Sequence, residues 1–408
     1  MFLKNVNKHY NLGKDTYTWE QRELNEVANR FNNLRVPITS NHRESGSTPY
    51  YGANGIQDYV KGYTHDGEFL LIAEDGANDL KDYPIHYVSG KIWVNNHAHV
   101  LQAIENYMNN YFLMYALKKL NIQPYLVGGG RSKLNSDVMM RLKLYLPNRE
   151  EQNKLSALLK NIDETITLLQ RKINNLNKVK KGLLQKLFPT KQSINPRIRF
   201  NGFNQDWEQR ELGEVFKIID GDRGKNYPNE NDFYSSGHTL FLDTGNVQKN
   251  GFNFNNLKFI NKEKDEMLKN GKLQVYDFIL TSRGTLGNVA YYSPKIQAKY
   301  SSIRINSAML ILRPISRNSI SDSLMTAILG GKIIEDFMSK NHVGSAQPHI
   351  TKRDFSKLNV YLPSKYEEQE QLGMFILEVD KTITLLQKEL EMNKQIKKGF
   401  LQKLFPKE

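Results

Sequence analysis

The chain has 408 residues, no cysteine and a formal net charge of +14 at pH 7. The length predicts two or three domains, and a hydrophobic fraction of 39% supports packed cores and argues against wholesale disorder. The lack of cysteine excludes disulfides and thiolate-bound metals, and the positive charge favours a polyanionic partner, most often a nucleic acid.

The positive charge has a second explanation, because a genome rich in A and T also enriches Lys, Asn and Ile.

The sequence also bears on where the protein acts. The first ten residues, MFLKNVNKHY, lack the apolar centre and cleavage site of a signal peptide. No run approaches the roughly 18 apolar residues of a membrane span. The sequence therefore predicts a soluble, cytoplasmic protein.

Residues 1–148 are predicted to form a first mixed α/β domain. FLLIAEDG and GKIWVNN are typical of strands, and residues 105–120 are typical of a helix. Residues 1–17 match nothing later in the chain, and we assign them no role.

Residues 149–189 are predicted to form one long helix. Apolar residues recur at alternating steps of four and three, which is the pattern of a coiled-coil seam; they are Leu155, Leu159, Ile162, Ile166, Leu169, Ile173, Leu176, Val179, Leu183 and Leu187. Pro147 precedes the helix and Pro189 ends it. A helix of about 40 residues is roughly 60 Å long.

After a linker at residues 190–204, residues 205–364 are predicted to form a second mixed α/β domain. YDFILTSRG and SAMLILRP are typical of strands, and residues 323–340 of a helix. Residues 365–408 carry a second long helix, between Pro363 and Pro406. Its seam contains one polar residue, Asn393, of the kind that fixes register; the seam is Leu372, Ile376, Val379, Ile383, Leu386, Leu390, Asn393, Ile396, Phe400 and Leu404.

The two halves of the chain are a tandem duplication. WEQRELNEV opens the first half and WEQRELGEV the second, while DETITLLQ recurs as DKTITLLQ and KKGLLQKLFP as KKGFLQKLFP. Each copy is thus a variable domain followed by a near-constant helix.

The two apolar stripes are most simply buried against each other. The second helix would return antiparallel along the first, which gives an α+β fold: two mixed α/β domains joined by two long antiparallel helices with pseudo-two-fold symmetry. The alternative is that each helix packs on its own domain.

The loops of both domains carry side chains suited to DNA. Arg matches guanine, Asn and Gln match adenine, and Lys, Ser and Thr contact phosphates. In the first domain the candidates are Tyr51, Asn54, Gln57, Asn95, Asn96, His97, His99, Arg131 and Lys133. In the second they are Arg223, Lys225, Asn226, Ser282, Arg283, Thr285, Asn288, Gln347, His349 and Lys352. The alternative for any single residue is an ordinary solvated loop side chain.

Motifs of catalysis are missing from the sequence. There is no phosphate-binding Walker A motif, no HExxH, no Gly-x-Ser-x-Gly and no NPPF-like methyl-transfer motif. The HAH at His97–His99 lacks a third ligand in sequence, so we interpret it as a core or groove pair and predict no metal site.

Taken together, these motifs resemble the specificity (S) subunit of type I restriction–modification enzymes. The resemblance covers essentially the whole chain, and its most specific parts are the helix endings GLLQKLFP and GFLQKLFP. GKIWVNNHAHVL and FILTSRGTLGNVAYY are similar to two types of target-recognition domain.

The resemblance implies that each domain reads one half of a bipartite site in double-stranded DNA. It also implies that the helix pair sets the spacing and docks two methyltransferase (M) subunits, which two restriction (R) subunits join. S-adenosylmethionine, ATP and Mg would then bind to those partners, and this chain would have no cofactor and no catalytic residue. The rival functions are a stand-alone methyltransferase or nuclease, and a structural coiled-coil protein.

Overall fold

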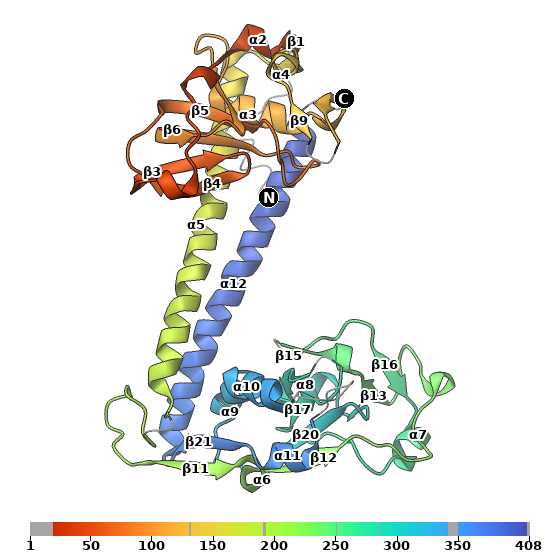
Figure 1. Cartoon of the computed structure of the whole chain (residues 1–408). Coiled ribbons are helices and arrows are strands. Elements are labelled where there is room, and N and C mark those ends of the chain that lie inside the picture. Colours follow the sequence, from red (N-terminus) through yellow and green to blue (C-terminus); the bar gives the residue numbers. More distant parts are fainter. Residues whose placement is uncertain are drawn as a thin grey trace. The chain divides into compact units, whose positions relative to one another are not determined.

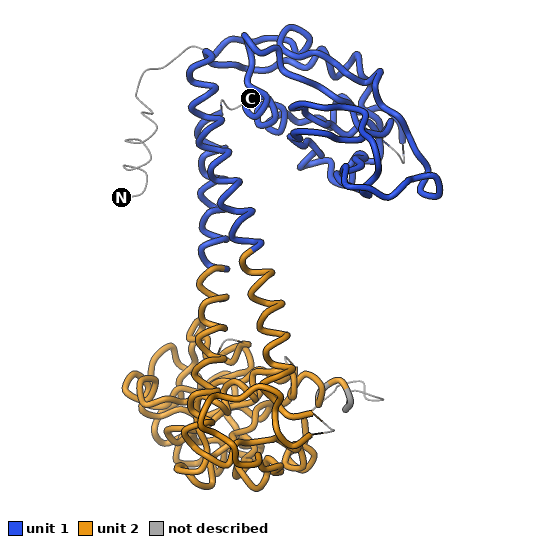
Figure 2. Tube along the Cα trace, turned by 90° about the vertical axis from the view of Figure 1, so that its left-hand side faces the viewer, with its two compact units in different colours: residues 1–171, 387–408 blue, residues 172–386 orange. Residues whose placement is uncertain are grey.

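The protein is described by a computed structural model that covers residues 19–129, 132–190, 193–249, 251–284, 286–341 and 350–405. It forms two compact units (Figure 2). Unit 1 comprises Met1–Arg171 with Gln387–Glu408, and unit 2 comprises Lys172–Leu386. Each unit therefore contains one mixed α/β domain and a part of both long helices.

The domain of unit 1 is built on a six-stranded sheet of order β2-β7-β5-β6-β3-β4. The strands pair antiparallel except β3 and β6, which are parallel. They span Ala28–Arg30 (β2), Ser45–Gly52 (β3), Gly55–Val60 (β4), His65–Ala73 (β5), Ile85–Val94 (β6) and Ala98–Ala103 (β7), followed by the short pair Leu126–Val127 (β8) and Lys133–Leu134 (β9).

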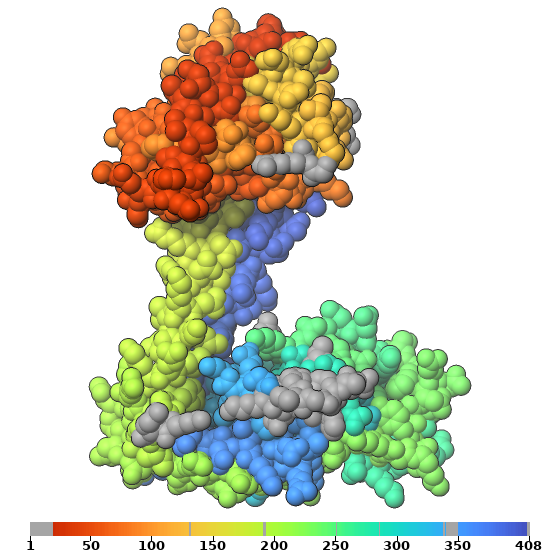
Figure 3. Space-filling view, viewed as in Figure 1, coloured from red at the N-terminus to blue at the C-terminus, as the bar shows by residue number. Residues whose placement is uncertain are grey.

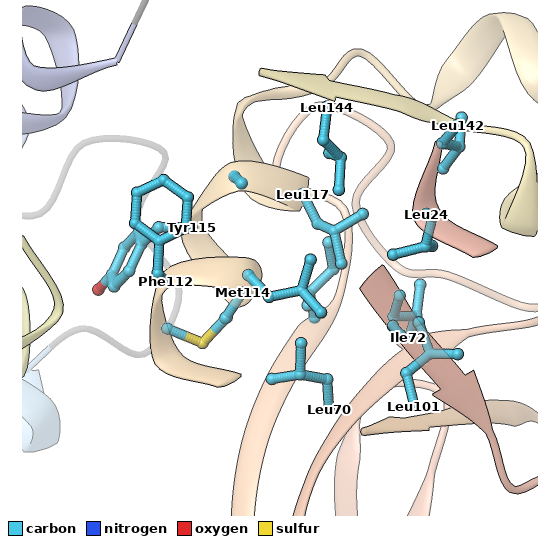
Figure 4. Close-up of a cluster of buried hydrophobic side chains, with 14 of the residues drawn as sticks. Leu24, Leu70, Ile72, Leu101, Phe112, Met114, Tyr115, Leu117, Leu142 and Leu144 are labelled. Carbon is cyan, nitrogen blue, oxygen red and sulfur yellow. The ribbon is translucent and has the colours of Figure 1, made fainter. Parts of the chain in front are cut away.

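Helix α3, Asn110–Lys119, covers this sheet and closes the core. Asn109 caps the helix, because its side chain accepts hydrogen bonds from the amides of Tyr111 and Phe112. Phe112, Met114 and Leu117 belong to the same buried cluster as Leu70, Ile72 and Leu101 of the sheet, and Leu117 faces the sheet residues (Figure 4).

The domain of unit 2 is built on two larger sheets, beside which β14 and β15 form a short two-stranded ribbon. The first, of order β12-β20-β17-β18, is antiparallel throughout, and in the second, of order β16-β13-β19, the pair β13–β19 is parallel. The strands are Phe216–Asp220 (β12), Thr239–Leu242 (β13), Val247–Gln248 (β14), Gly251–Phe252 (β15), Lys258–Ile260 (β16), Phe278–Thr281 (β17), Val289–Tyr291 (β18), Ile303–Ile305 (β19) and Met309–Pro314 (β20). Its helices are Lys262–Met267 (α7), Pro294–Lys299 (α8), Asp322–Leu329 (α9), Lys332–Asn341 (α10) and Lys352–Ser356 (α11).

The helix predicted at residues 323–340 is in fact two helices, α9 and α10, which are separated by Gly330 and Gly331. A Cβ atom on Gly331 would lie 2.9 Å from the carbonyl oxygen of Ala327, closer than a real side chain allows. The prediction of one helix was wrong, because the apolar pattern continues across a backbone break that the glycines permit.

Both domains begin and end in the same way. Strand β1, Glu20–Glu23, pairs with β10, Lys143–Leu146, and β11, Trp207–Glu211, pairs with β21, Asn359–Pro363. A one-turn helix with a capping box follows the first strand of each pair: Leu24–Val27 (α2) and Leu212–Val215 (α6). A further short helix in unit 1, Ser136–Met140 (α4), precedes β10.

The two long helices are α5, Arg149–Leu187, and α12, Tyr366–Leu404 (Figure 1). They pair antiparallel, as predicted. In unit 1, Leu158 and Ile162 of α5 pack against Phe400 of α12, with Ile166 and Ile396 beside them. The predicted seam is largely buried or half-buried.

Two predictions about the seam were wrong. Val179 is 55% exposed, because a helix of 3.6 residues per turn drifts away from a strict seven-residue repeat. Asn393 donates to the carbonyl oxygen of Glu389 in its own helix, at 2.9 Å, and among the described residues its side chain makes no hydrogen bond to α5.

Two ion pairs, made by equivalent residues of the two copies, join α5 to α12 and specify the register of the helix pair instead. Asp163 of α5 pairs with Lys397 of α12 at 2.6 Å in unit 1, and Lys180 of α5 pairs with Asp380 of α12 in unit 2. Asp163 and Asp380 are the same residue of the repeat, as are Lys180 and Lys397. The same aspartate and the same lysine of the repeat therefore form both ion pairs, once in each unit.

The end of each long helix completes the core of a domain. In unit 1, Phe405 is 5% exposed and stacks on Phe112, with its ring centroid 5.5 Å away, and it meets Trp19 edge-on at 5.8 Å. In unit 2, Phe188 meets Trp207 edge-on at 6.0 Å. Phe188 and Phe405 are the ninth residues of the two decamers, so both copies of the decamer perform the same packing.

In the described part of the chain, no helix is long and apolar enough to cross a membrane.

We expect Phe405→Ala to loosen the domain of unit 1, because replacing a buried Phe by Ala costs about 3–5 kcal/mol. Limited proteolysis of the full chain should then cut residues 19–148 faster while residues 205–364 keep their wild-type rate. Met392→Ala, at a position 60% exposed on the same helix, is the matched control and should change neither rate. Equal acceleration in both domains would contradict a local role of Phe405.

Candidate nucleic-acid interface

The candidate residues of unit 1 converge at one edge of its sheet. The hairpin of β3 and β4 carries Tyr51, Asn54 and Gln57, and the turn between β6 and β7 carries the run from Asn95 to His97. The amide of Asn95 donates to the carbonyl oxygen of Tyr51 at 3.1 Å, and its side chain approaches Oε1 of Gln57 at 3.5 Å. Two separate sequence clusters thus form one surface.

A half-buried carboxylate, Glu74, organises this surface. Its Oε2 accepts from Nη1 of Arg35 at 2.7 Å, and its Oε1 lies 2.9 Å from Nζ of Lys133. Its backbone amide bonds the carbonyl oxygen of His97 at 2.8 Å, and its carbonyl oxygen bonds the amide of Leu134 at 2.7 Å. One residue therefore ties four segments together.

The pKa of Glu74 reflects this role. Burial alone would raise the pKa, but the hydrogen bonds from Arg35 and Lys133, with the charge of Arg35, lower it below the ordinary value of a glutamate. The carboxylate is therefore charged at neutral pH, and its two cations hold the loops in place.

Some candidates position the loops and do not face solvent. His99 is 1% exposed; its Nε2 donates to the carbonyl oxygen of Leu134 at 2.8 Å, and its Nδ1 accepts from Asn32 at 2.9 Å. Burial lowers the pKa of His99, which favours this neutral form. Asn95 is 4% exposed and accepts from the amide of His97 at 2.8 Å. Both side chains are buried and bonded within the domain, so in this structure they support the loops, and a direct contact of either with DNA stays a prediction.

Asn54 is exposed and also joins two loops. Its side-chain amide donates to the carbonyl oxygen of Gly76 at 2.9 Å, and its Oδ1 accepts from the amide of Asn78 at 3.0 Å. It therefore links the β3–β4 hairpin to the loop that follows Glu74. Gln57, Asn96 and Lys133 are exposed, while Tyr51 and His97 are half-buried, the latter 2.7 Å from Asp75.

The candidates of unit 2 converge at one end of its first sheet. The amides of Ser282 and Arg283, which follow β17, both bond the carbonyl oxygen of Ala308, before β20, at 2.8 and 3.2 Å. Nη2 of Arg223, which follows β12, donates to the carbonyl oxygen of Ser307 at 3.2 Å. Three loops from three neighbouring strands thus meet.

The loop after β12 is held by Asp222, which is 6% exposed. Its carboxylate accepts from the amides of Gly224 at 2.7 Å, Lys269 at 2.7 Å and Asn270 at 3.1 Å. Burial opposes the charged form, but these amides lower the pKa of Asp222, so the carboxylate stays charged. Arg304, 5% exposed, clamps the same segment through the carbonyl oxygens of Asn270 at 2.6 Å and Leu268 at 3.0 Å.

The remaining candidates of unit 2 are divided between surface and support. Arg223, Lys225, Arg283 and Lys352 are exposed. Ser282 is 1% exposed, and its direct contact with DNA stays a prediction. The side-chain amides of Asn226 and Asn288 bond the carbonyl oxygens of Met267 at 3.2 Å and Val247 at 3.0 Å. Arg131, Thr285, Gln347 and His349 lie outside the described residues.

Sequence reasoning missed the residues that hold these loops, among them Arg35, Glu74, Asp222, Asp265 and Arg304. One signal was available: Arg304 lies between Ile303 and Ile305 in a run that otherwise reads as a buried strand, and its guanidinium bonds Asp265 at 2.5 Å. In the part of the chain that the structure describes, no three His, Asp or Glu side chains gather as a metal site.

Several known proteins are similar to this chain. The sequence profile of the family described as the type I restriction modification DNA specificity domain matches residues 17–178 and 204–395. A relative from Haemophilus influenzae, named as a type I restriction enzyme specificity subunit, is 46% identical over 140 residues, which span 34% of this chain and 36% of the relative. The type I restriction enzyme MjaVIII specificity subunit of Methanocaldococcus jannaschii is 24% identical over 410 residues, 94% of this chain and 91% of the relative.

The fold is shared with a solved structure. The S subunit of a type I restriction–modification system from M. genitalium superposes with a TM-score of 0.70 at 16% identity, over 97% of this chain and 98% of that chain.

We expect Glu74→Gln to destabilise the domain of unit 1 at neutral pH, because Arg35 and Lys133 lose a charged acceptor. Since the pKa of Glu74 is lowered by folding, the stabilisation is present above the unfolded-state pKa and is lost as the pH falls through the folded-state pKa. Thermal melting should therefore separate the variant from wild type at pH 7 and bring them together in acid.

The control for this prediction is Glu44→Gln, which removes a carboxylate that pairs with Lys61 at 3.3 Å where both side chains are 76% exposed. An exposed pair of this kind contributes little, so its melting temperature should stay at the wild-type value. A variant at Glu74 that melts like the one at Glu44 would contradict the organising role of Glu74.

Proposed function

Because the chain belongs to the family of type I restriction–modification DNA specificity domains, we propose that each of its two mixed α/β domains reads one half of a bipartite DNA site. The observation that carries the proposal is that different loop clusters are mounted on the same frame. The ribbons β1–β10 and β11–β21, the capping boxes and the long helices repeat, while the sheets and the loops at their edges differ.

The chemistry of the exposed residues suits double-stranded DNA. Arg283 and Arg223 in unit 2 can donate to guanine or to phosphates, and Asn96 and Gln57 in unit 1 can pair with adenine. Fixed backbones around Glu74 and Asp222 reduce the entropy that the loops lose on binding. Because the chain carries a net charge of +14, its affinity for DNA should fall steeply as salt concentration rises.

The long helices offer a repeated surface for a repeated partner. Leu168 is 51% exposed and its equivalent, Leu385, is 56% exposed. Both lie in the run TITLLQ, which is identical in the two copies. Side chains of α5 form part of the molecular surface in Figure 3. Two copies of one exposed apolar residue fit two copies of one partner, which we take to be the methyltransferase (M) subunit, with restriction (R) subunits joining the complex.

In this proposal the chain itself is not an enzyme and binds no cofactor. It directs the partners, which bind S-adenosylmethionine for the methylation of adenine, and ATP and Mg for cleavage. The complex would set the distance between the half-sites through the helix pair, and it would act on cellular DNA in the cytoplasm.

The proposal predicts that single exposed residues serve single half-sites. Arg283→Ala should weaken binding of competitor DNA that carries the half-site of unit 2, by a factor of about 10, because one good pair to a base is worth about 1–3 kcal/mol. Asn96→Ala should do the same for the other half-site. Fluorescence competition with oligonucleotides that are scrambled in one half measures both, and loss of discrimination at both halves in either variant would contradict one domain per half-site.

Replacing an exposed leucine of the long helices by arginine tests whether these helices bind the M subunits. Leu168→Arg and Leu385→Arg should each remove one of two M subunits from the purified complex, because a cation in an apolar contact is not compensated. Val179→Arg is the matched control, since Val179 is 55% exposed on α5 but its equivalent, Ile396, is half-buried and the surface is not repeated there. Mass measurement by light scattering gives the stoichiometry; two M subunits retained in both leucine variants would exclude this surface.

A further inference from the structure

Both domains are attached to the start of a long helix by the same buried glutamine. In unit 1, Gln152 is 2% exposed, accepts from the amide of Asn109 at 3.1 Å and donates to the carbonyl oxygen of Pro147 at 3.0 Å. In unit 2, Gln369 is 3% exposed, accepts from the amide of Ser321 at 2.9 Å and donates to the carbonyl oxygen of Pro363 at 2.9 Å. This attachment is part of the duplicated frame.

Unit 1 has a second polar attachment farther along the helix. The hydroxyls of Tyr111 and Tyr115, one turn apart on α3, both donate to Oδ2 of Asp163 on α5, the first at 2.5 Å. The other carboxylate oxygen, Oδ1, lies 2.6 Å from Nζ of Lys397 on α12. Both oxygens of one carboxylate are thus engaged, and three helices meet at it.

Unit 2 keeps the ion pair of this cluster without the tyrosines. Asp380 pairs with Lys180, and among the described residues no other side chain bonds its carboxylate. Counted from the helix caps, Asn109 and Ser321, the positions of Tyr111 and Tyr115 are taken in α9 by Ser323 and Ala327.

The polar contacts of α9 instead stay near the start of α12. Oγ of Ser321 donates to Oε2 of Glu370 at 2.6 Å, and Oγ of Ser323 lies 3.2 Å from the same atom. Nε1 of Trp207 also donates to Oε1 of Glu368, at 3.3 Å. Glu368, Gln369 and Glu370 are consecutive, so these polar attachments of the domain fall on one turn of the helix.

The difference has a mechanical consequence. Gln152 and Asp163 are eleven residues apart on one helix, or roughly 16 Å at 1.5 Å per residue. A body held at two points this far apart cannot pivot about either one, whereas polar contacts on a single turn leave pivoting opposed by apolar packing alone. Hydrogen bonds from hydroxyls to a carboxylate are among the stronger ones, and Tyr115 is only 2% exposed.

We propose that Tyr111, Tyr115 and Asp163 are positioning residues that fix the angle of the first recognition domain on its helices, and so restrict the gap between the half-sites that the protein accepts. The inference rests on the proposed function, because it assigns these residues a part in reading a bipartite site. It also predicts that adjustment to a DNA of unequal gap occurs in unit 2, where the second attachment is absent among the described residues.

The test uses the complete complex with its M subunits and three DNA substrates. One carries the cognate gap, and the others carry a gap one base pair shorter or longer. We expect Tyr111→Phe/Tyr115→Phe to raise the methylation rate at the altered gaps, relative to the cognate gap, by about tenfold, since a hydrogen bond to a charged group is worth about the free energy of a tenfold change. The bases recognised in each half should not change.

A control separates positioning from a loss of stability. Tyr83→Phe removes a hydroxyl in the same domain from a residue that is buried like Tyr115, but this hydroxyl bonds the carbonyl oxygen of Ala73, at 2.9 Å, and not a long helix. It should lower the rates at all three gaps in proportion and leave their ratio unchanged. If the double variant is poorly folded, Tyr111→Phe alone retains the bond of Tyr115 and should give a smaller shift in the same direction.

An unchanged ratio in a folded double variant, or an equal change in Tyr83→Phe, would overturn the inference. Failure of the proposed function itself looks different: the wild-type complex would then methylate no site composed of two halves, whatever the gap.

Discussion

The structure depends on one packing constraint, which is that the end of each long helix fills the core of a domain. Phe405 lies between Trp19 and Phe112 in unit 1, and Phe188 lies against Trp207 in unit 2. The first domain is therefore completed by Phe405, which follows α12, and the second by Phe188, which follows α5. Each helix must begin in one unit and end in the other, and the antiparallel pairing follows from that requirement.

The same constraint accounts for what is repeated in the sequence and what is not. The two decamers place equivalent phenylalanines against equivalent tryptophans, and DETITLLQ and DKTITLLQ supply the aspartates of the two ion pairs between α5 and α12. The sheets carry no such requirement. They differ in strand number and order between the units, which leaves the loops at their edges free to take different chemistry on one frame.

The long helices and several strands could be predicted from the sequence, because a single apolar pattern dominates each of these segments. The heptads and the flanking prolines indicated both long helices, and β5, β6, β17 and β20 lie within or around the predicted strands. Prediction was poorer where two sequence signals conflict. The glycine pair at 330–331 interrupts an apolar run that indicated one helix, and the side chain of Asn393 bonds the backbone of its own helix.

The candidate interface shows where such prediction ends. Residue type identified the loops but could not separate the exposed Asn96 and Arg283 from the buried Asn95, His99 and Ser282. Exposure is decided by contacts between segments far apart in the chain, such as the bonds that join Glu74 to Arg35, His97 and Lys133. The cluster of Tyr111, Tyr115 and Asp163, which the described residues form in unit 1 only, could not be predicted from the sequence either. The aspartate is repeated in both helices, and the two tyrosines lie in a variable domain.

The central claim is that two unlike readers on one frame specify a two-part DNA sequence, and genome-wide mapping of N6-methyladenine tests it most directly. Cells would express this chain with its M subunit, and a second strain would carry the same chain with residues 205–364 exchanged for the corresponding domain of a relative. The account predicts a motif of two halves with a fixed gap, of which the exchange alters one half only. A motif that changes in both halves, or no new methylation by an M subunit that is active with another specificity subunit, would contradict it.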